Sequence, residues 1–295
     1  MNFIISVNDD PTYFPFLEKV VPLYKSFGHE VNVAYVTKDR NEKILDIDCD
    51  SLMILDEVDG YESGIQAKLA RSFYASKLEE EKVYTLLDVD QFLINFKWLE
   101  EKIDENYSKD YDLLAFGANG YKTGRFPPNP NIDGKFPMYF TSATPRGFRK
   151  LYDIDRDCEF SDLLSRYSVI ENPRDGYEST KNPFRRFSDE SLFAWMIRER
   201  DIKVKHVDLE KWRFQSSGNR IDRAPEVMVR WRLPNFDLNF WQQKKLSIQQ
   251  KQMILNMYFF DVFPARPYGP HKEIIDDILD TILMMRGDAV NNYGV

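Results

Sequence analysis

The chain has 295 residues, of which 43% are hydrophobic and 15% aromatic, enough for a sizeable core in one large domain or two small ones. The net charge of −8, with charges of both signs mixed along the chain, argues against a nucleic-acid-binding protein that uses a broad basic face. The two cysteines, Cys49 and Cys158, lie in polar surroundings and indicate a reducing compartment. No apolar stretch approaches the roughly 20 residues of a transmembrane helix, and the first residues lack the features of a signal peptide. We therefore expect a cytoplasmic protein without a transmembrane segment.

Strand-like and helix-like patterns alternate over the first 95 residues. Helical spacing predicts one helix from Phe14 to Gly28, kinked or split at Pro22, and a longer helix at Ser63–Lys82 with Ser63 as its N-cap. Apolar or alternating runs predict strands at Phe3–Val7, Glu30–Thr37, Ser51–Val58 and in the segment KVYTLLDVDQFLIN, residues 82–95. This alternation predicts an α/β fold with a mainly parallel sheet.

The rest of the chain is less regular. Gly, Pro and Asn are frequent between Gly117 and Pro137, which predicts a loop over the strand ends, and a second irregular stretch covers Asn172–Glu190. Further strands are expected at Met138–Ala143 and Lys203–Leu209, and helices at PRGFRKLYDI and Ser191–Asp201. From Phe236 onward the pattern is helical. We expect one domain over residues 1–235, with residues 236–295 as a helical extension packed on it.

Asp88-Val89-Asp90 is the motif with the clearest chemical meaning. The two carboxylates follow an apolar strand, where they would repel each other and lose hydration unless a cation were present. Parallel sheets bind ligands beyond the carboxyl ends of their strands, and carboxylates suit Mg²⁺ or Mn²⁺. The alternative is a solvated acidic turn, because this tripeptide is common in acidic proteins.

Three segments resemble the GT-A glycosyltransferases, a family that uses a metal ion and a DxD motif to bind a nucleotide diphosphate. They are FIISVND, AKLARSFYASKLEEEKVYTLLDVD and FSDESLFAWMI, and the resemblance covers roughly residues 1–210. It implies a GT-A (Rossmann-like) fold, with residues 1–95 binding the nucleotide sugar and the metal and residues 96–235 binding the acceptor. It also implies that Asp90 coordinates Mn²⁺ or Mg²⁺, while Asp88 contacts the donor sugar or ribose. Asp88 is in addition a candidate metal ligand, and Val89 a candidate contact to the donor.

The resemblance also suggests roles for residues outside the DxD motif. Residues after the first strand would hold the base and ribose, although NDDP is equally good turn chemistry, and Asp56 would contact the base. Lys68 and Arg71 share a helix face and would reach the diphosphate or the sugar, or they form an exposed basic face. The first-strand candidates are Ser6, Val7, Asn8 and Asp9.

Downstream candidates would complete the site. Asp189 or Glu190 would act on the acceptor hydroxyl as a base in an inverting enzyme, or would stabilise the transition state in a retaining one; alternatively both are acids at a helix start. His206 would be a third metal ligand or an uninvolved strand residue. Arg213, in the segment 211–223, would meet the phosphates from a lid, or it belongs to an ordinary solvated loop.

The sequence therefore predicts a metal-dependent glycosyltransferase that transfers a sugar from a nucleotide-diphosphate donor, with UDP-sugar favoured, to a hydroxyl of a glycan or glycoprotein acceptor. One alternative is a sugar-phosphate nucleotidyltransferase, although the first strand is followed by acidic residues instead of a glycine-rich basic loop. The other is a non-catalytic carbohydrate- or partner-binding protein in which the DxD motif is a turn.

Overall fold

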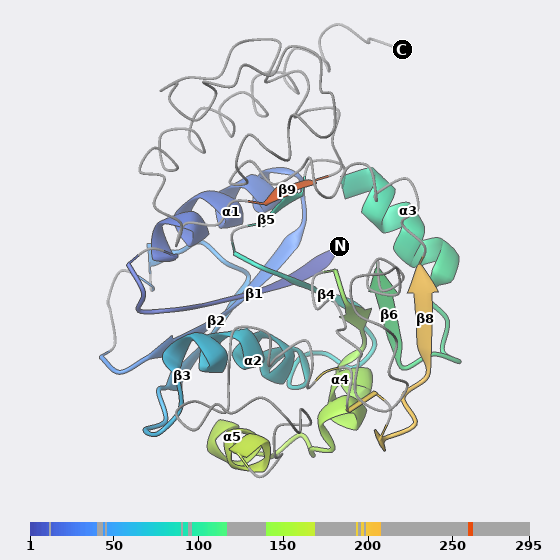
Figure 1. Cartoon of the computed structure of the whole chain (residues 1–295). Coiled ribbons are helices and arrows are strands. Elements are labelled where there is room, and N and C mark those ends of the chain that lie inside the picture. Colours follow the sequence, from blue (N-terminus) through green and yellow to red (C-terminus); the bar gives the residue numbers. More distant parts are fainter. Residues whose placement is uncertain are drawn as a thin grey trace, which may run out of the picture.

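The computed structural model describes residues 1–11, 13–39, 44, 46–89, 91–93, 96–116, 140–168, 193, 196–197, 199–207 and 259–261 (Figure 1). In chain order the elements are β1 (Asn2–Asn8), α1 (Phe14–Ser26), β2 (Glu30–Thr37), β3 (Ser51–Asp56), α2 (Ser63–Ala75), β4 (Tyr84–Leu87), β5 (Gln91–Leu93), α3 (Phe96–Asn106), β6 (Leu113–Phe116), β7 (Ser142–Ala143), α4 (Pro145–Tyr152), α5 (Phe160–Ser168), β8 (Val204–Val207) and β9 (Phe259–Asp261). None of the described helices is both long and apolar enough to cross a membrane.

Seven strands form one mixed, mainly parallel sheet in the order β3-β2-β1-β4-β7-β6-β8. Strand β1 lies parallel to both β2 and β4, β2 is parallel to β3, and β6 is parallel to β8. Of the described strands in this sheet, β7 alone runs antiparallel to its neighbours, β4 and β6. The predicted α/β class with a mainly parallel sheet is therefore confirmed.

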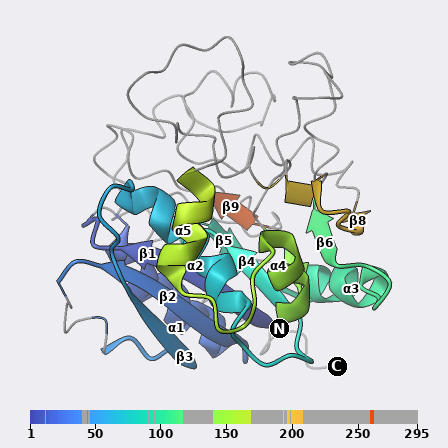
Figure 2. The ribbon, with the colours of Figure 1, turned by 90° about the horizontal axis from the view of Figure 1, so that it is seen from below.

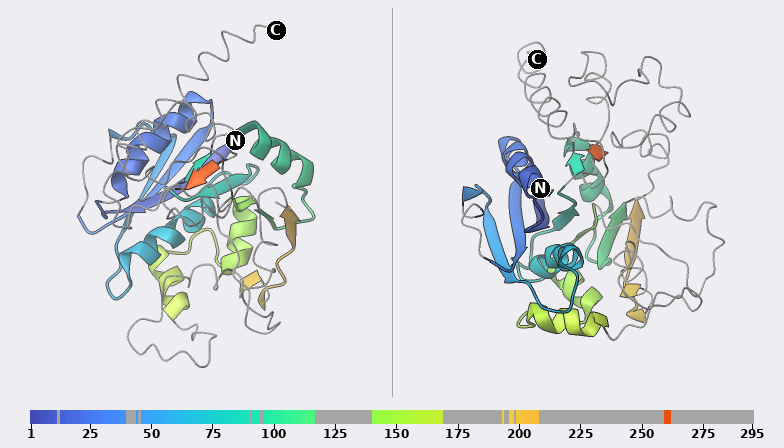
Figure 3. Two further views of the ribbon diagram at one scale, coloured as in Figure 1. Left: turned by 45° about the horizontal axis from the view of Figure 1, so that its top comes forward. Right: turned by 60° about the vertical axis from the view of Figure 1, so that its left-hand side comes forward.

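Helices cover both faces of the sheet and bury a separate core on each. One core joins α1 and α3 to the sheet, and the other joins α2, α4 and α5 to it. Figures 1 and 2 show these two layers, with α2, α4 and α5 in front of the strands when the molecule is seen from below. Figure 3 shows the same layers from two further directions. Strand β1 alternates between the cores, since Phe3, Ile5 and Val7 face one and Ile4 the other. Burial on both faces explains its nearly continuous apolar sequence.

Two predicted helices differ from those observed. Helix α1 continues through Pro22, which lies on its exposed face; there the carbonyl of Glu18, deprived of its usual donor, can bond to water. Helix α2 ends at Ala75 and not at Lys82, because the chain then turns and the Ser76 hydroxyl bonds to the Phe73 carbonyl at 2.6 Å. Ser63 is the first residue of α2 and not its N-cap, which is Glu62.

The carboxyl-terminal region contains one described segment, and it is a strand. Residues 259–261 form β9, which pairs antiparallel with β5 directly after the DxD motif, so the helix predicted there is wrong for these residues. Helical positions at 193, 196, 197 and 199 agree with the helix predicted over 191–201. The predicted loops at 117–137 and 172–190, and the other residues from 236 onward, lie outside the described residues.

Candidate active site at the carboxyl edge of the sheet

The chain order creates a switch point between β1 and β4. The connection from β1 to β2 passes through α1 on one face, whereas the connection from β3 to β4 passes through α2 on the other. Strands β1 and β4 are neighbours in the sheet, so their following segments diverge and leave a crevice at their carboxyl ends. Asn8 ends β1, Asp9 directly follows it, and Asp88 directly follows β4, so this crevice carries predicted site residues from both strands.

Arg71 and Asp88 form the most buried ion pair at this edge. Arg71 lies on α2 with 3% of its side chain exposed, and its Nη1 donates to Oδ1 of Asp88, which is 39% exposed. A guanidinium that is this deeply buried requires a charge partner, and the carboxylate supplies it. The structure therefore brings together a basic residue of α2 and the first acid of the DxD motif. Lys68, one turn earlier, is half-buried.

Strand β4 ends at Leu87, so Asp88 lies beyond the strand and Val89 lies in a turn. The strand predicted within residues 82–95 is therefore interrupted at Asp88, and strand structure is present again in β5, from Gln91. Val89 is 6% exposed and packs in the core, as does Val7, so a ligand in the crevice could be contacted only by the backbone of either residue. Ser6, within β1, is half-buried.

The exposed carboxylate of Asp9 joins the ends of β1 and β2. It accepts hydrogen bonds from the Tyr35 hydroxyl, from Thr37 Oγ1 at 2.7 Å and from the Lys38 backbone N–H at 3.1 Å. Within NDDP, the turn chemistry that the sequence predicts is present as the Asp10 backbone N–H donating to Asn8 Oδ1 at 3.4 Å, and a turn starting at Asp10 follows, where the backbone N–H groups of Tyr13 and Phe14 donate to the Asp10 carbonyl. Asp9 thus organises the edge through contacts within the chain, and its contact with a nucleoside stays a prediction.

The edge extends from β1 toward β3. The Asn8 side-chain amide donates to Ser63 Oγ at 3.0 Å, which fixes the amino end of α2 beside the end of β1. Asp56 is exposed at the end of β3, where it is the register partner of Thr37 on β2. Because β1, β2 and β3 are adjacent, Asp9 and Asp56 lie along one rim of the sheet with the end of β2 between them.

The predicted third metal ligand lies elsewhere on the sheet. His206 is exposed on β8, and the order β4-β7-β6-β8 places it three strand spacings from Asp88, about 14 Å across the sheet. Among the described residues no three His, Cys, Asp or Glu side chains gather in a possible metal site. Asp90, Asp189, Glu190 and Arg213 lie outside the described residues.

The described half of the motif nevertheless fits a hard divalent cation. Asp88 presents a part-exposed carboxylate at the carboxyl end of β4, and Asp90 follows two residues later in the sequence. Carboxylate oxygens are suitable ligands for Mg²⁺ and Mn²⁺, which keep open positions for phosphate oxygens. The donor set is therefore chemically suitable, with Asp88 as its described member.

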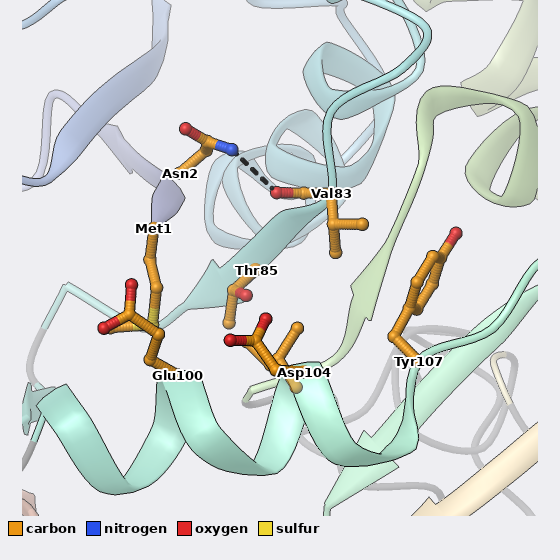
Figure 4. A pocket seen from close by; sticks show the side chains of 8 residues that line it. Met1, Asn2, Val83, Thr85, Glu100, Asp104 and Tyr107 are labelled. Atoms are coloured by element: carbon orange, nitrogen blue, oxygen red, sulfur yellow. Dashed lines mark hydrogen bonds between the residues drawn. The ribbon is translucent and has the colours of Figure 1, made fainter.

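Two cavities lie at the opposite, amino edge of the sheet. One, of about 300 Å³, lies between α3 and the starts of β1 and β4; Figure 4 shows Glu100 and Asp104 on the α3 side, and the Asn2 amide bonded to the Val83 carbonyl at 3.0 Å. The other, of about 650 Å³, is bordered by Lys25 and Lys82. Both lysines are ion-paired within the chain, so the charges lining this cavity are already matched.

Several polar residues that shape the site were not predicted from the sequence. Tyr35 and Thr37 were counted only as members of a strand, and Gln66 only as part of a helix, yet their side chains tie the edge together. The available signal was polarity inside apolar patterns, since Gln66 lies next to Ile65 and near Leu69 on the buried side of α2.

Comparison with known proteins identifies a structural likeness but no family. No family model and no curated protein sequence matches the chain. Among solved structures, the crystal structure of the galactosyltransferase LgtC in complex with donor and acceptor sugar analogs matches with a TM-score of 0.48 and 9% identity, over 95% of this chain and 96% of the other. Similarity at this level identifies neither the activity nor the ligands of the chain, so any function has to be inferred from its own residues.

Proposed function

We propose that the chain is a metal-dependent glycosyltransferase that uses a nucleotide-diphosphate sugar, with a UDP-sugar favoured, and transfers the sugar to a hydroxyl of a glycan or glycoprotein. The observation that supports this best is the Arg71–Asp88 pair at the switch point between β1 and β4. A buried cation beside a part-exposed carboxylate can position that carboxylate for ligand binding where parallel sheets bind their ligands.

In this proposal Asp88 and Asp90 hold Mn²⁺ or Mg²⁺, and His206, three strand spacings away on β8, is outside the ligand set. When bound, such an ion neutralises the diphosphate and makes it a better leaving group. Arg71 fixes the orientation of Asp88, and the rim from Asp9 to Asp56 receives the nucleoside. The amino end of α2, held at this edge by Asn8, adds a favourable dipole for phosphate.

The acceptor side rests on sequence alone. Asp189 or Glu190 would face the acceptor hydroxyl, taking its proton in an inverting reaction or stabilising positive charge in a retaining one. Arg213 would meet the phosphates when the donor is bound.

The test is the release of UDP from a panel of UDP-sugars with Mn²⁺ and candidate glycan acceptors. We expect release to depend on Mn²⁺ and to be lost in Asp88→Asn. It should be retained in Glu30→Gln, a matched loss of one carboxylate at the amino edge, where Glu30 pairs with Lys82 at 2.9 Å. Turnover in Asp88→Asn equal to that of the wild type would contradict the proposal.

A further inference from the structure

A completely buried glutamine connects α2 to the loop before it. Gln66 is 0% exposed, and its Oε1 accepts from the Val58 backbone N–H at 2.9 Å. Its Nε2 donates to the Val58 carbonyl at 2.9 Å and to the Tyr61 carbonyl at 3.1 Å. Side chains in the first turns of a helix point back toward its amino end, which explains how Gln66 reaches residues 58 and 61. The loop thus uses both amide hydrogens and the amide oxygen.

This loop, residues 57–62, belongs to the carboxyl edge of the sheet. The Glu57 backbone N–H donates to the Thr37 carbonyl at 2.8 Å, and the Glu57 carboxylate lies 3.5 Å from the ammonium of Lys38. The Lys38 backbone N–H in turn donates to Asp9. At the other end of the loop, Ser63 accepts from Asn8. The loop is therefore connected to the ends of both β1 and β2.

The middle of the loop depends on Gln66 for its shape. Asp59 and Gly60 are exposed, and Gly60 has a φ of +91°, a conformation that residues with a side chain rarely adopt. The turn at Gly60 brings the Tyr61 carbonyl back to Gln66. Inside the protein, backbone groups without partners are costly, so the three bonds from one amide strongly favour this loop conformation.

We propose that Gln66 is a positioning residue of the donor site: it holds loop 57–62 in the conformation that borders the proposed nucleoside site beside Asp9 and Asp56. This role rests on the proposed function. It adds to that function a residue that touches no substrate and acts through the loop.

The first test compares Gln66→Leu, which keeps the volume but removes all three bonds, with Ser72→Ala. Ser72 is also buried on α2, but its hydroxyl bonds to the Leu69 carbonyl at 3.1 Å and to the Tyr152 hydroxyl at 2.6 Å, away from the loop. We expect Gln66→Leu to weaken UDP binding with Mn²⁺ about ten-fold and to raise KM for the donor with little change in kcat. Ser72→Ala should leave both unchanged.

Hydrogen exchange at the Val58 amide provides a readout that needs no nucleotide. This N–H donates to Gln66 Oε1, so we expect its exchange to be at least about ten-fold faster in Gln66→Leu and unchanged in Ser72→Ala.

Gln66→Glu adds a pH-dependent rescue. Its carboxylate would face the Val58 and Tyr61 carbonyls without a hydrogen to donate, whereas the protonated acid restores one donor. Burial, together with the neighbouring acids Glu57, Asp59 and Glu62 in the sequence, raises the pKa of this carboxyl. Relative to the wild type at the same pH, UDP binding by this variant should therefore recover as the pH is lowered and the carboxyl becomes protonated.

Each contrary result has a distinct meaning. If the wild type binds UDP and Gln66→Leu binds it equally well, the positioning role is overturned, whether or not Val58 exchange is faster. Unchanged exchange at Val58 also overturns it. If the wild type itself binds no UDP, the proposed function fails and the role of Gln66 in it fails too; that result is seen before any variant is compared.

Discussion

The two edges of the seven-stranded sheet both carry ion pairs, but they use them differently. At the amino edge the pairs are at least partly open to solvent: Lys25 contacts Asp48 at 2.9 Å, Lys82 contacts Glu30 at 2.9 Å, and Arg149 contacts Glu80 at 2.7 Å, with 17% to 87% of these side chains exposed. At the carboxyl edge Arg71 is 3% exposed and pairs with Asp88. Exposed pairs contribute little to stability, whereas a buried guanidinium needs its partner. At the carboxyl edge, therefore, the Arg71 guanidinium is buried at a cost in desolvation free energy that the Asp88 carboxylate offsets.

The polar side chains follow the same division. At the carboxyl edge Asp9 gathers donors from two residues of β2 and the backbone that follows it, and Gln66 gathers three bonds from one loop. These networks hold loops, whose conformation would otherwise vary. At the amino edge Lys25 of α1 pairs with Asp48, and Lys82 pairs with Glu30 at the start of β2. Rigid loops around a part-exposed acid are typical of a ligand site.

The largest expected effect is that of Arg71→Met. The apolar stem is kept, but Asp88 loses its buried partner, so we expect a loss of about 2 kcal/mol in the free energy of unfolding and at least about 100-fold weaker binding of UDP with Mn²⁺. Urea denaturation and calorimetry measure the two effects. Lys82→Met at the amino edge is the matched control and should change neither quantity measurably. Equal effects of the two variants would remove the distinction between the edges.

The next effect concerns Asp9. Tyr35 is completely buried, and its hydroxyl donates a hydrogen bond to the Asp9 carboxylate. Tyr35→Phe removes this hydroxyl. The free energy of unfolding should fall by about 1 kcal/mol, the usual contribution of one such bond. Thr37 still donates, so nucleotide binding should weaken by less than about five-fold. Binding that is lost altogether would mean that Asp9 depends on Tyr35 far more than its remaining bonds suggest.

A smaller effect is expected from acid titration at the amino edge. The hydrogen bond from Arg149 lowers the pKa of Glu80 below its usual 4.5. A carboxyl with a lowered folded-state pKa stabilises the protein above its unfolded pKa, and this contribution disappears as the pH falls through the folded value. The wild type should therefore lose slightly more stability than Glu80→Gln between about pH 6 and about pH 3.5. Because Glu80 is 39% exposed, the difference should be only about 0.5 kcal/mol in urea denaturation. A larger loss in the variant would contradict this assignment.

The smallest effect is expected from His206→Ala. His206 is exposed on β8, with β7 and β6 between its strand and β4. At this separation we expect Mn²⁺-dependent UDP binding to stay within about two-fold of the wild type. A loss comparable to that of Asp88→Asn would show that His206 is a metal ligand after all and that the edge rearranges when the metal binds.

The sequence predicts the sheet well because parallel strands buried on both faces have a simple apolar pattern. The predicted strand Glu30–Thr37 is β2 without any shift, and KVKHVDL contains β8. The end of α2 could not be predicted, because Leu78 continues the apolar helical spacing although Ser76 already bonds back to Phe73. Helix α3, helix α5 and strand β6 were not assigned at all.

The site is predictable to a smaller extent. The DxD motif and Arg71 were found because acids after an apolar strand and a basic residue on the preceding helix are recognisable types, and the fold brings Arg71 to Asp88 across 17 positions. The roles of Tyr35 and Gln66 were missed because each depends on which loop packs against it, and that contact is set by tertiary structure. Buried polar groups usually have hydrogen-bond partners, but the sequence does not show which residues are the partners of Tyr35 and Gln66.

The most direct test of the central claim is calorimetric titration of UDP and of GDP, each with Mn²⁺ and with EDTA, into the wild type, Asp88→Asn, Asp90→Ala and the amino-edge control Glu30→Gln. We predict that one nucleotide, UDP, binds the wild type and Glu30→Gln only when Mn²⁺ is present, and that both DxD variants bind it at least about 100-fold more weakly. If neither nucleotide binds the wild type under any of these conditions, or if binding ignores both Asp88 and Asp90, the carboxyl edge is not a nucleotide-diphosphate site and the DxD motif is a structural turn.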